Sequence, residues 1–187
     1  MRIKIVPRLI FSIIFSIFIF QSLHADLKWS PLREGNKVVL IRHALAPGGG
    51  DPAGFKIDDC KTQRNLNKKG IDQSKKIGEL FKKNKIEIDQ VFSSQWCRCK
   101  DTAKYAFKKF IEFPALNSTF QSPHDKNEPR QLKEIKKFVK NWDGKGKNLI
   151  LVTHYSIIVS ITKAVPVSGE IIVTDKNFNL LSNIQTN

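Results

Sequence analysis

The 187-residue chain has no internal repeat and no low-complexity tract, and no apolar run reaches the usual length of a membrane-spanning helix. Its longest apolar run covers residues 9–20 and is broken only by Ser12 and Ser16. A membrane-spanning helix needs about 20 predominantly apolar residues, and a run of about 12 to 15 is short for such a span. The run therefore indicates a targeting segment, and the rest of the chain has the length of one domain.

The amino terminus has the pattern of a signal peptide. Three basic residues precede the apolar run: Arg2, Lys4 and Arg8. Leu23-His24-Ala25 follows it at the place of a cleavage site. An uncleaved membrane anchor is the alternative. We expect residues 1–25 to be removed as a signal peptide and residues 26–187 to form a single domain. The mature protein would then be periplasmic or secreted, without a membrane span.

Acidic residues are scarce: 17 oppose 32 basic ones, for a net charge of +15. Without the basic residues of the signal segment the chain keeps 29 basic against 17 acidic residues, a net charge of +12. Most of the excess is lysine on predicted helix faces. Such faces are either simply solvated or attract anionic substrates and envelope surfaces. The chain shows neither a nucleic-acid recognition module nor an aromatic platform, so no nucleic-acid partner is predicted.

Only three cysteines are present, Cys60, Cys97 and Cys99. In an exported protein two of them are expected to pair, which leaves one thiol. Cys97 is the favoured partner of Cys60 because it lies closer to the amino end of a predicted helix, but Cys99 remains possible. A zinc site would need additional spaced histidines, so no metal is predicted.

The most informative segment is the apolar run 38–41 (VVLI), which ends in Arg42 and His43. An uninterrupted β-branched and aliphatic run is typical of a strand that is covered on both faces, as in a parallel α/β sheet. A loop rich in glycine and proline follows at residues 46–50. Open α/β sheets bind their ligands at the carboxyl edge of the strands, which is where these two side chains would lie.

Two further strands repeat this arrangement. The run 149–153 ends directly in His154, and the run 91–94 leads into a helix whose first turn carries Arg98. Four cationic or potentially cationic groups would therefore meet at one sheet edge: Arg42, His43, Arg98 and His154. Without nearby acids they would repel one another, so the cluster indicates an anion, and above all a phosphate.

Strands alternate with helices along the rest of the chain. Asn67 caps a predicted helix with an apolar stripe, and Pro129 suits the first turn of another. Residues 111–116 and 170–174 are predicted strands, while residues 44–65 form a long loop at the pocket wall. The polar segment 117–127 shows no periodicity. This alternation predicts a three-layer α/β/α sandwich with a mostly parallel central sheet.

Four motifs resemble those of the histidine phosphatase superfamily, which has the phosphoglycerate-mutase-like fold. Arg42-His43-Ala44 is similar to the family's Arg-His-Gly, with alanine in the place of glycine. Thr153-His154 stands where the family usually has Gly-His. The Ser-x-x-x-x-Arg-x-x-x-Thr-Ala pattern matches at Ser93, Arg98, Thr102 and Ala103. The opening of the family's first helix matches at Leu66, Gly70 and Gln73. Together the motifs extend over about residues 37–174.

The resemblance implies a catalytic site with His43 as nucleophile. A histidine attacks phosphorus through one ring nitrogen when the other nitrogen donates to a backbone carbonyl. The product is a phosphohistidine, which water then hydrolyses. Arg42 and Arg98 would bind the phosphoryl oxygens with forked hydrogen bonds, and a protonated His154 would add a donor. No cofactor is implied.

The family also uses a carboxylate that protonates the leaving oxygen, and its usual place is shortly after the third strand. Residues 116–120 contain no acid. The nearest candidates lie in the two flanking loops: Asp51, Asp58, Asp59, Asp125 and Glu128. Each is more typical of a loop or cap residue. The missing acid favours substrates with good leaving groups, such as phosphohistidine, and argues against a mutase.

The sequence therefore predicts an exported, metal-independent phosphatase that acts on a phosphomonoester or a phosphohistidine. Its partner would be a phosphorylated small molecule or envelope component. The alternative is a catalytically weak module that binds a phosphorylated ligand of the cell envelope. The sequence does not indicate the oligomeric state.

Overall fold

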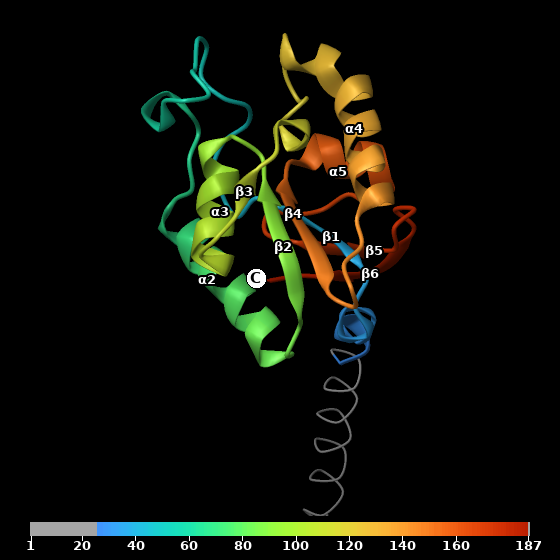
Figure 1. The fold of residues 1–187 in the computed structure, drawn as a ribbon. Coiled ribbons are helices and arrows are strands. Elements are labelled where there is room, and N and C mark those ends of the chain that lie inside the picture. The colour runs from blue at the N-terminus through green and yellow to red at the C-terminus, as the bar shows by residue number, and fades with distance from the viewer. Residues whose placement is uncertain (1–25, 187) are drawn as a thin grey trace, which may run out of the picture.

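The computed structural model describes residues 26–186 (Figure 1). The predicted signal peptide, residues 1–25, lies outside the described residues, and its cleavage remains a prediction. No helix in the described part of the chain is long and apolar enough to cross a membrane.

The described residues form a six-stranded sheet in the order β3-β2-β4-β1-β5-β6. Its strands are β1 (Val38–Arg42), β2 (Ile88–Ser93), β3 (Ile111–Glu112), β4 (Asn148–Thr153), β5 (Ile171–Thr174) and β6 (Leu180–Ile184). The pairs β1–β4, β4–β2 and β2–β3 are parallel, whereas β5 and β6 add antiparallel strands at one side. The predicted α/β fold with a mostly parallel central sheet is confirmed.

Helices cover both faces of this sheet, as Figure 1 shows. On one face lie α2 (Lys68–Lys83) and α3 (Cys97–Phe107), and on the other lie α4 (Glu128–Asn141) and α5 (Tyr155–Thr162). Successive side chains of a strand point to opposite faces. In β1, Val39 and Ile41 accordingly join the core with α2 and α3, and Val38 and Leu40 join the core with α4 and α5. The central strands β1 and β4 are thus buried on both faces.

The helix boundaries follow the local signals in the sequence. The Asn67 side chain accepts a hydrogen bond from the Gly70 N–H at 2.9 Å and so caps α2. Pro129 lies in the first turn of α4, as predicted. Short 3-10 helices occupy Cys60–Thr62, Pro114–Leu116 and His124–Asn127 in the connecting loops.

Three predictions for the elements are incomplete. Residues 111–116 do not form one strand, because β3 ends at Glu112 and a 3-10 helix begins at Pro114, which has no N–H for a ladder. The strand at 170–174 is followed by β6, which has no alternating apolar pattern and is largely exposed. Residues 26–34 are helical, which the sequence analysis did not predict.

Candidate active site

The parallel strands deliver the four predicted residues to one place. Arg42 ends β1, His43 follows it, and the His43 N–H donates to the Thr153 carbonyl at the end of β4 at 2.9 Å. His154 comes next, and its ring centroid lies 5.4 Å from that of His43. Arg98 is the second residue of α3, shortly after β2. The predicted gathering of these side chains at the carboxyl edge is confirmed.

These four residues line a cavity of about 110 Å³. The loops above the sheet edge complete its wall, with residues 48–50 on one side and Ser118, Phe120 and Gln121 on another. The cavity is large enough to hold a group of phosphoryl size. Two larger depressions, of about 630 and 710 Å³, contain none of the four residues.

His43 is held in one tautomer by its own backbone neighbour. Its Nδ1 lies 2.9 Å from the Ala44 carbonyl oxygen, which only accepts, so Nδ1 carries the proton and Nε2 has a free lone pair. The side chain is 3% exposed. Burial, with the charge of Arg98, lowers the pKa of His43 well below its ordinary value. The residue is therefore a neutral base with Nε2 available.

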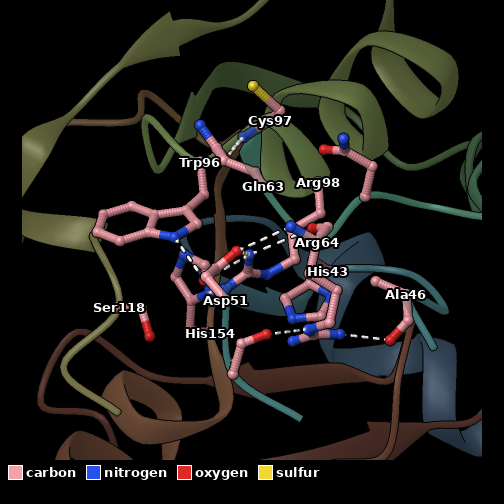
Figure 2. A network of polar contacts seen from close by, with 12 residues as sticks. His43, Ala46, Asp51, Gln63, Arg64, Trp96, Cys97, Arg98, Ser118 and His154 are labelled. Atoms are coloured by element: carbon pink, nitrogen blue, oxygen red, sulfur yellow. Dashed lines mark hydrogen bonds and ion pairs between the residues drawn. The ribbon is translucent and has the colours of Figure 1, made fainter. Parts of the chain in front are cut away.

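Arg98 is not free of acids, which corrects the expectation of a purely cationic cluster. Its Nη1 donates to Asp51 Oδ1 at 2.8 Å, and both side chains are only 3% exposed. The other carboxylate oxygen accepts the indole N–H of Trp96 at 3.0 Å, and Oδ1 also accepts the backbone N–H of Arg64. Figure 2 shows Asp51 between Trp96 and Arg98. The cluster thus contains one compensating negative charge.

Asp51 is unsuited to be the missing proton donor. Burial alone would raise the pKa of its carboxyl, but the hydrogen bonds and charge of Arg98 outweigh this effect, and the pKa is lowered. The carboxylate is thus ionised, and Trp96 and Arg64 occupy its remaining acceptor sites. Its role is to hold Arg98 in place.

Two arginines of the site keep a donor that no described residue accepts. Arg42 uses Nη1 to donate to the Pro166 carbonyl at 2.9 Å, and its guanidinium lies over the Tyr155 ring, 5.3 Å from the centroid. The Nε atoms of Arg42 and Arg98 are buried and have no hydrogen-bond partner among the described residues. Buried donors are rarely left unpaired, and both arginines line the cavity, so their guanidinium groups are suited to a bound oxyanion.

His154 is held from behind by a polar network. Its Nε2 lies 2.8 Å from Ser94 Oγ, which itself donates to Asn117 Oδ1, so the network assigns the proton to Nε2. Nδ1 faces Arg98 Nη2 at 3.5 Å. Burial and the neighbouring Arg98 and His43 lower the pKa of His154 well below its ordinary value. The protein's own charges thus oppose the protonated His154 that we expected, and only an anionic ligand would favour it.

The other carboxylate candidates lie outside the cavity. Glu128 accepts hydrogen bonds from the hydroxyls of Thr119 and Ser160, both at 2.9 Å, and so links its helix to two neighbours. Asp59 caps a 3-10 helix by accepting the Lys61 N–H. None of the described residues that line the cavity is a carboxylate. In the described part of the chain, no group of three or more His, Cys, Asp or Glu residues is arranged to hold a metal ion.

A family model, the histidine phosphatase superfamily (branch 1), matches residues 38–143, more than half of the chain. The chain belongs to the histidine phosphatase superfamily. The resemblance inferred from the four motifs is confirmed. No curated protein sequence matches the chain.

Solved structures of other proteins share the fold at low sequence identity. TTHB049 from Thermus thermophilus is 14% identical with a TM-score of 0.56, over 81% of this chain and 99% of that one. The protein histidine phosphatase SixA, complexed with tungstate, is 15% identical with a TM-score of 0.52, over 80% and 97%. Phosphoglycerate mutase from Thermus thermophilus is 12% identical with a TM-score of 0.53, over 81% and 99%.

Within this superfamily fold, the sequence analysis missed two residues of the site. It considered Asp51 only as a possible acid and assigned no role to Arg64. Arg64 lines the cavity and donates from Nε to the Gly50 carbonyl at 2.7 Å and from Nη1 to the Ala46 carbonyl. Both residues lie in the irregular loop 44–65, which has no periodicity that would have placed them in the site.

A disulfide joins the first loop to the Arg98 helix. Cys60 is bonded to Cys97, the favoured partner, with an S–S distance of 2.02 Å. Cys99 is a free, buried thiol that lies 3.3 Å from His154 Nε2, and burial raises its pKa to about 12. It is therefore an inert packing residue behind the site.

Proposed function

We propose that the protein is an exported phosphatase that hydrolyses a phosphorylated substrate through a phosphohistidine on His43. The observation that carries the proposal is the hydrogen bond from His43 Nδ1 to its own following carbonyl. It leaves Nε2 as a neutral nucleophile next to guanidinium groups with unused donors. The amino-terminal pattern and the Cys60–Cys97 disulfide support export, because disulfides persist in oxidising compartments.

The reaction has two displacement steps at phosphorus. In the first, His43 Nε2 forms a bond to phosphorus. The bond between phosphorus and the leaving group breaks, and the leaving group departs with the electron pair of that bond. In the second, water attacks phosphorus, the N–P bond breaks, and inorganic phosphate and a proton are released. The guanidinium groups of Arg42 and Arg98 stabilise the charge on the transferring oxygens throughout. No metal is needed for these steps because the guanidinium groups supply the positive charge.

The substrate is a phosphoryl compound whose leaving group departs without a proton from a protein carboxylate. This follows from the cavity lining, which contains arginines, histidines and uncharged residues. Phosphohistidine and aryl phosphates have such leaving groups. Tungstate is bound in SixA, and we expect it to occupy the cavity of this protein as well.

The absence of a carboxylate among the described residues that line the cavity also supports one alternative, a module that binds a phosphorylated envelope component without turnover. Without an acid, a poor leaving group such as a sugar alkoxide would be held but not released. The two functions differ in whether a covalent phosphoenzyme forms.

Incubation of the mature protein with p-nitrophenyl phosphate and EDTA separates the two functions. We expect nitrophenol release by the wild type and an acid-labile phosphohistidine on His43 after rapid quenching. His43→Ala should abolish release, and Arg42→Ala or Arg98→Ala should reduce it about 100-fold or more, as removal of one preorganised donor does. Arg130→Ala, an exposed arginine on α4, is the matched control. Tungstate binding without any release would support the binding module instead.

Export is tested independently of activity. We expect the expressed full-length chain to be found outside the cytoplasm with an amino terminus near Asp26. A product that retains Met1 and stays in the membrane fraction would support the anchor alternative.

A further inference from the structure

A third arginine of the cavity, Arg64, has no part in the two steps above. Its side chain lines the cavity with His43 and Arg98. Nε and Nη1 are bound to the carbonyls of Gly50 and Ala46. No partner for Nη2 is found among the described residues.

Arg64 is held at its backbone as well as at its guanidinium. Its N–H donates to Asp51 Oδ1 at 3.0 Å, and its carbonyl oxygen accepts from Arg98 Nη1 at 3.4 Å. The group is therefore fixed beside the other two guanidiniums and presents one terminal nitrogen.

The two hydrogen bonds from Arg64 to loop carbonyls do not by themselves explain why a charged side chain is found at this position. Two neutral carbonyls could be bound by an uncharged amide, whereas a guanidinium must also be desolvated next to other cations. Burial, and then the charge of Arg98, lowers the pKa of Arg64 from its ordinary value, so its neighbours oppose its charge. An arginine remains charged nevertheless, and this cost is offset when an anion enters the cavity.

The ionised side chains around the cavity can be summed to a net charge. Three guanidiniums line it, Asp51 is paired with one of them, and both histidines are neutral in the protein alone. Three positive charges against one negative leave a net charge of +2. A phosphomonoester above about pH 6 is close to a dianion, whereas a phosphodiester carries a single charge.

We infer that Arg64 is a third substrate-binding guanidinium, which makes the cavity select doubly ionised, terminal phosphoryl groups over singly charged ones. The inference rests on the proposed function only in that the cavity binds a phosphoryl group. Arg64 contributes through Nη2 while the loop carbonyls hold its other nitrogens.

The test compares two tetrahedral oxyanions of similar size, the dianion tungstate and the monoanion perrhenate. Their dissociation constants are measured by calorimetry at one pH and ionic strength, for wild type, Arg64→Gln and Arg64→Lys. Arg130→Gln, which removes a charge from the exposed pair with Glu134, is the matched control. Thermal melts establish that each variant is folded.

We expect Arg64→Gln to weaken tungstate binding about ten- to 100-fold, as expected for a hydrogen bond to a charged group. Coulomb energy is proportional to the ligand's charge, so the logarithmic loss for perrhenate should be about half as large. Arg64→Lys should keep part of the preference for tungstate. Equal logarithmic losses for the two anions, or losses no larger than in Arg130→Gln, would overturn the inference. Failure of the wild type to bind either anion would instead count against the phosphate site itself.

Discussion

In each of three site residues, one side-chain nitrogen is already hydrogen-bonded to a protein group, and this bond fixes where the remaining nitrogens point. The backbone occupies His43 Nδ1 and Arg42 Nη1, and a carboxylate occupies Arg98 Nη1. The remaining nitrogens have a single orientation, which is the preorganisation that electrostatic catalysis requires. The contribution of each residue therefore depends on its supporting contact as much as on its own chemistry.

Asp51 offers the clearest test of such a supporting contact. Asp51→Asn keeps the shape and most hydrogen bonds of the side chain but leaves Arg98 as an uncompensated buried charge. Removal of one partner of a buried pair costs about 3–5 kcal/mol in the free energy of unfolding. Urea denaturation at neutral pH measures this loss.

The exposed pair Arg130–Glu134 provides the control for this prediction. Glu134→Gln should change the free energy of unfolding by less than about 1 kcal/mol. If Asp51→Asn were no more destabilising than Glu134→Gln, Asp51 would not hold Arg98 in the way that we describe.

At the scale of the elements, the sequence pattern predicted those strands whose burial is determined by packing on both faces. The strands β1 and β4 are buried on both faces and appear in the sequence as unbroken apolar runs. The strand β6 is mostly exposed at the edge of the sheet and has no such pattern, so pairing with β5 decides its structure. The prediction for 111–116 is wrong beyond Glu112 because a proline stops the ladder after two residues.

The disulfide joins two elements that the sheet alone does not connect. It closes a loop with a sequence separation of 37 residues. On the chain-entropy account, such a cross-link stabilises the fold by about 4 kcal/mol. We expect dithiothreitol, or the double replacement Cys60→Ser with Cys97→Ser, to lower the free energy of unfolding by about this amount.

Cys99 supplies the internal control for the disulfide. As a buried thiol it should not react with a thiol reagent in the native, unreduced protein, and a single thiol should react after unfolding. Dithiothreitol should destabilise Cys99→Ala as much as the wild type. Three reactive thiols after unfolding of the unreduced protein would show that the disulfide does not form.

At the scale of the whole molecule, the site was predictable where topology alone brings residues together. Parallel strands share one carboxyl edge, so the sequence sufficed to group Arg42, His43, Arg98 and His154. Asp51 and Arg64 lie in an irregular loop without periodicity, and no local pattern indicates that they fold back onto α3. Their positions depend on tertiary contacts, including the ion pair and the disulfide.

The two buried neutral histidines make the stability of the whole domain depend on pH. Their pKa values are lowered in the folded state, so below about pH 6.5 the unfolded chain binds protons that the folded chain does not. Stability is therefore complete above this pH and is lost as the pH falls. The slope approaches about 2.7 kcal/mol per pH unit while both groups differ between the two states.

Urea midpoints at three pH values, about 7.5, 6.5 and 5.5, measure this dependence on both sides of the ordinary histidine pKa. His154→Gln should roughly halve the slope, because one of the two groups is gone. The lowered pKa of Asp51 adds a similar loss only near and below its ordinary value of about 4. A domain that is equally stable at the highest and the lowest of these pH values would contradict the assignment of neutral, buried histidines.

The small size of the cavity bears on how the protein would respond to its surroundings. A space of about 110 Å³ is large enough for a phosphoryl group, and the groups that line it include three arginines and two histidines. Under the proposed function, the released orthophosphate is the ligand that fits best, and it competes with every substrate alike. We expect inorganic phosphate to inhibit competitively, with one inhibition constant for all substrates. The rate of hydrolysis would then vary inversely with the orthophosphate concentration of the medium. It would be low when orthophosphate is plentiful and high when orthophosphate is depleted.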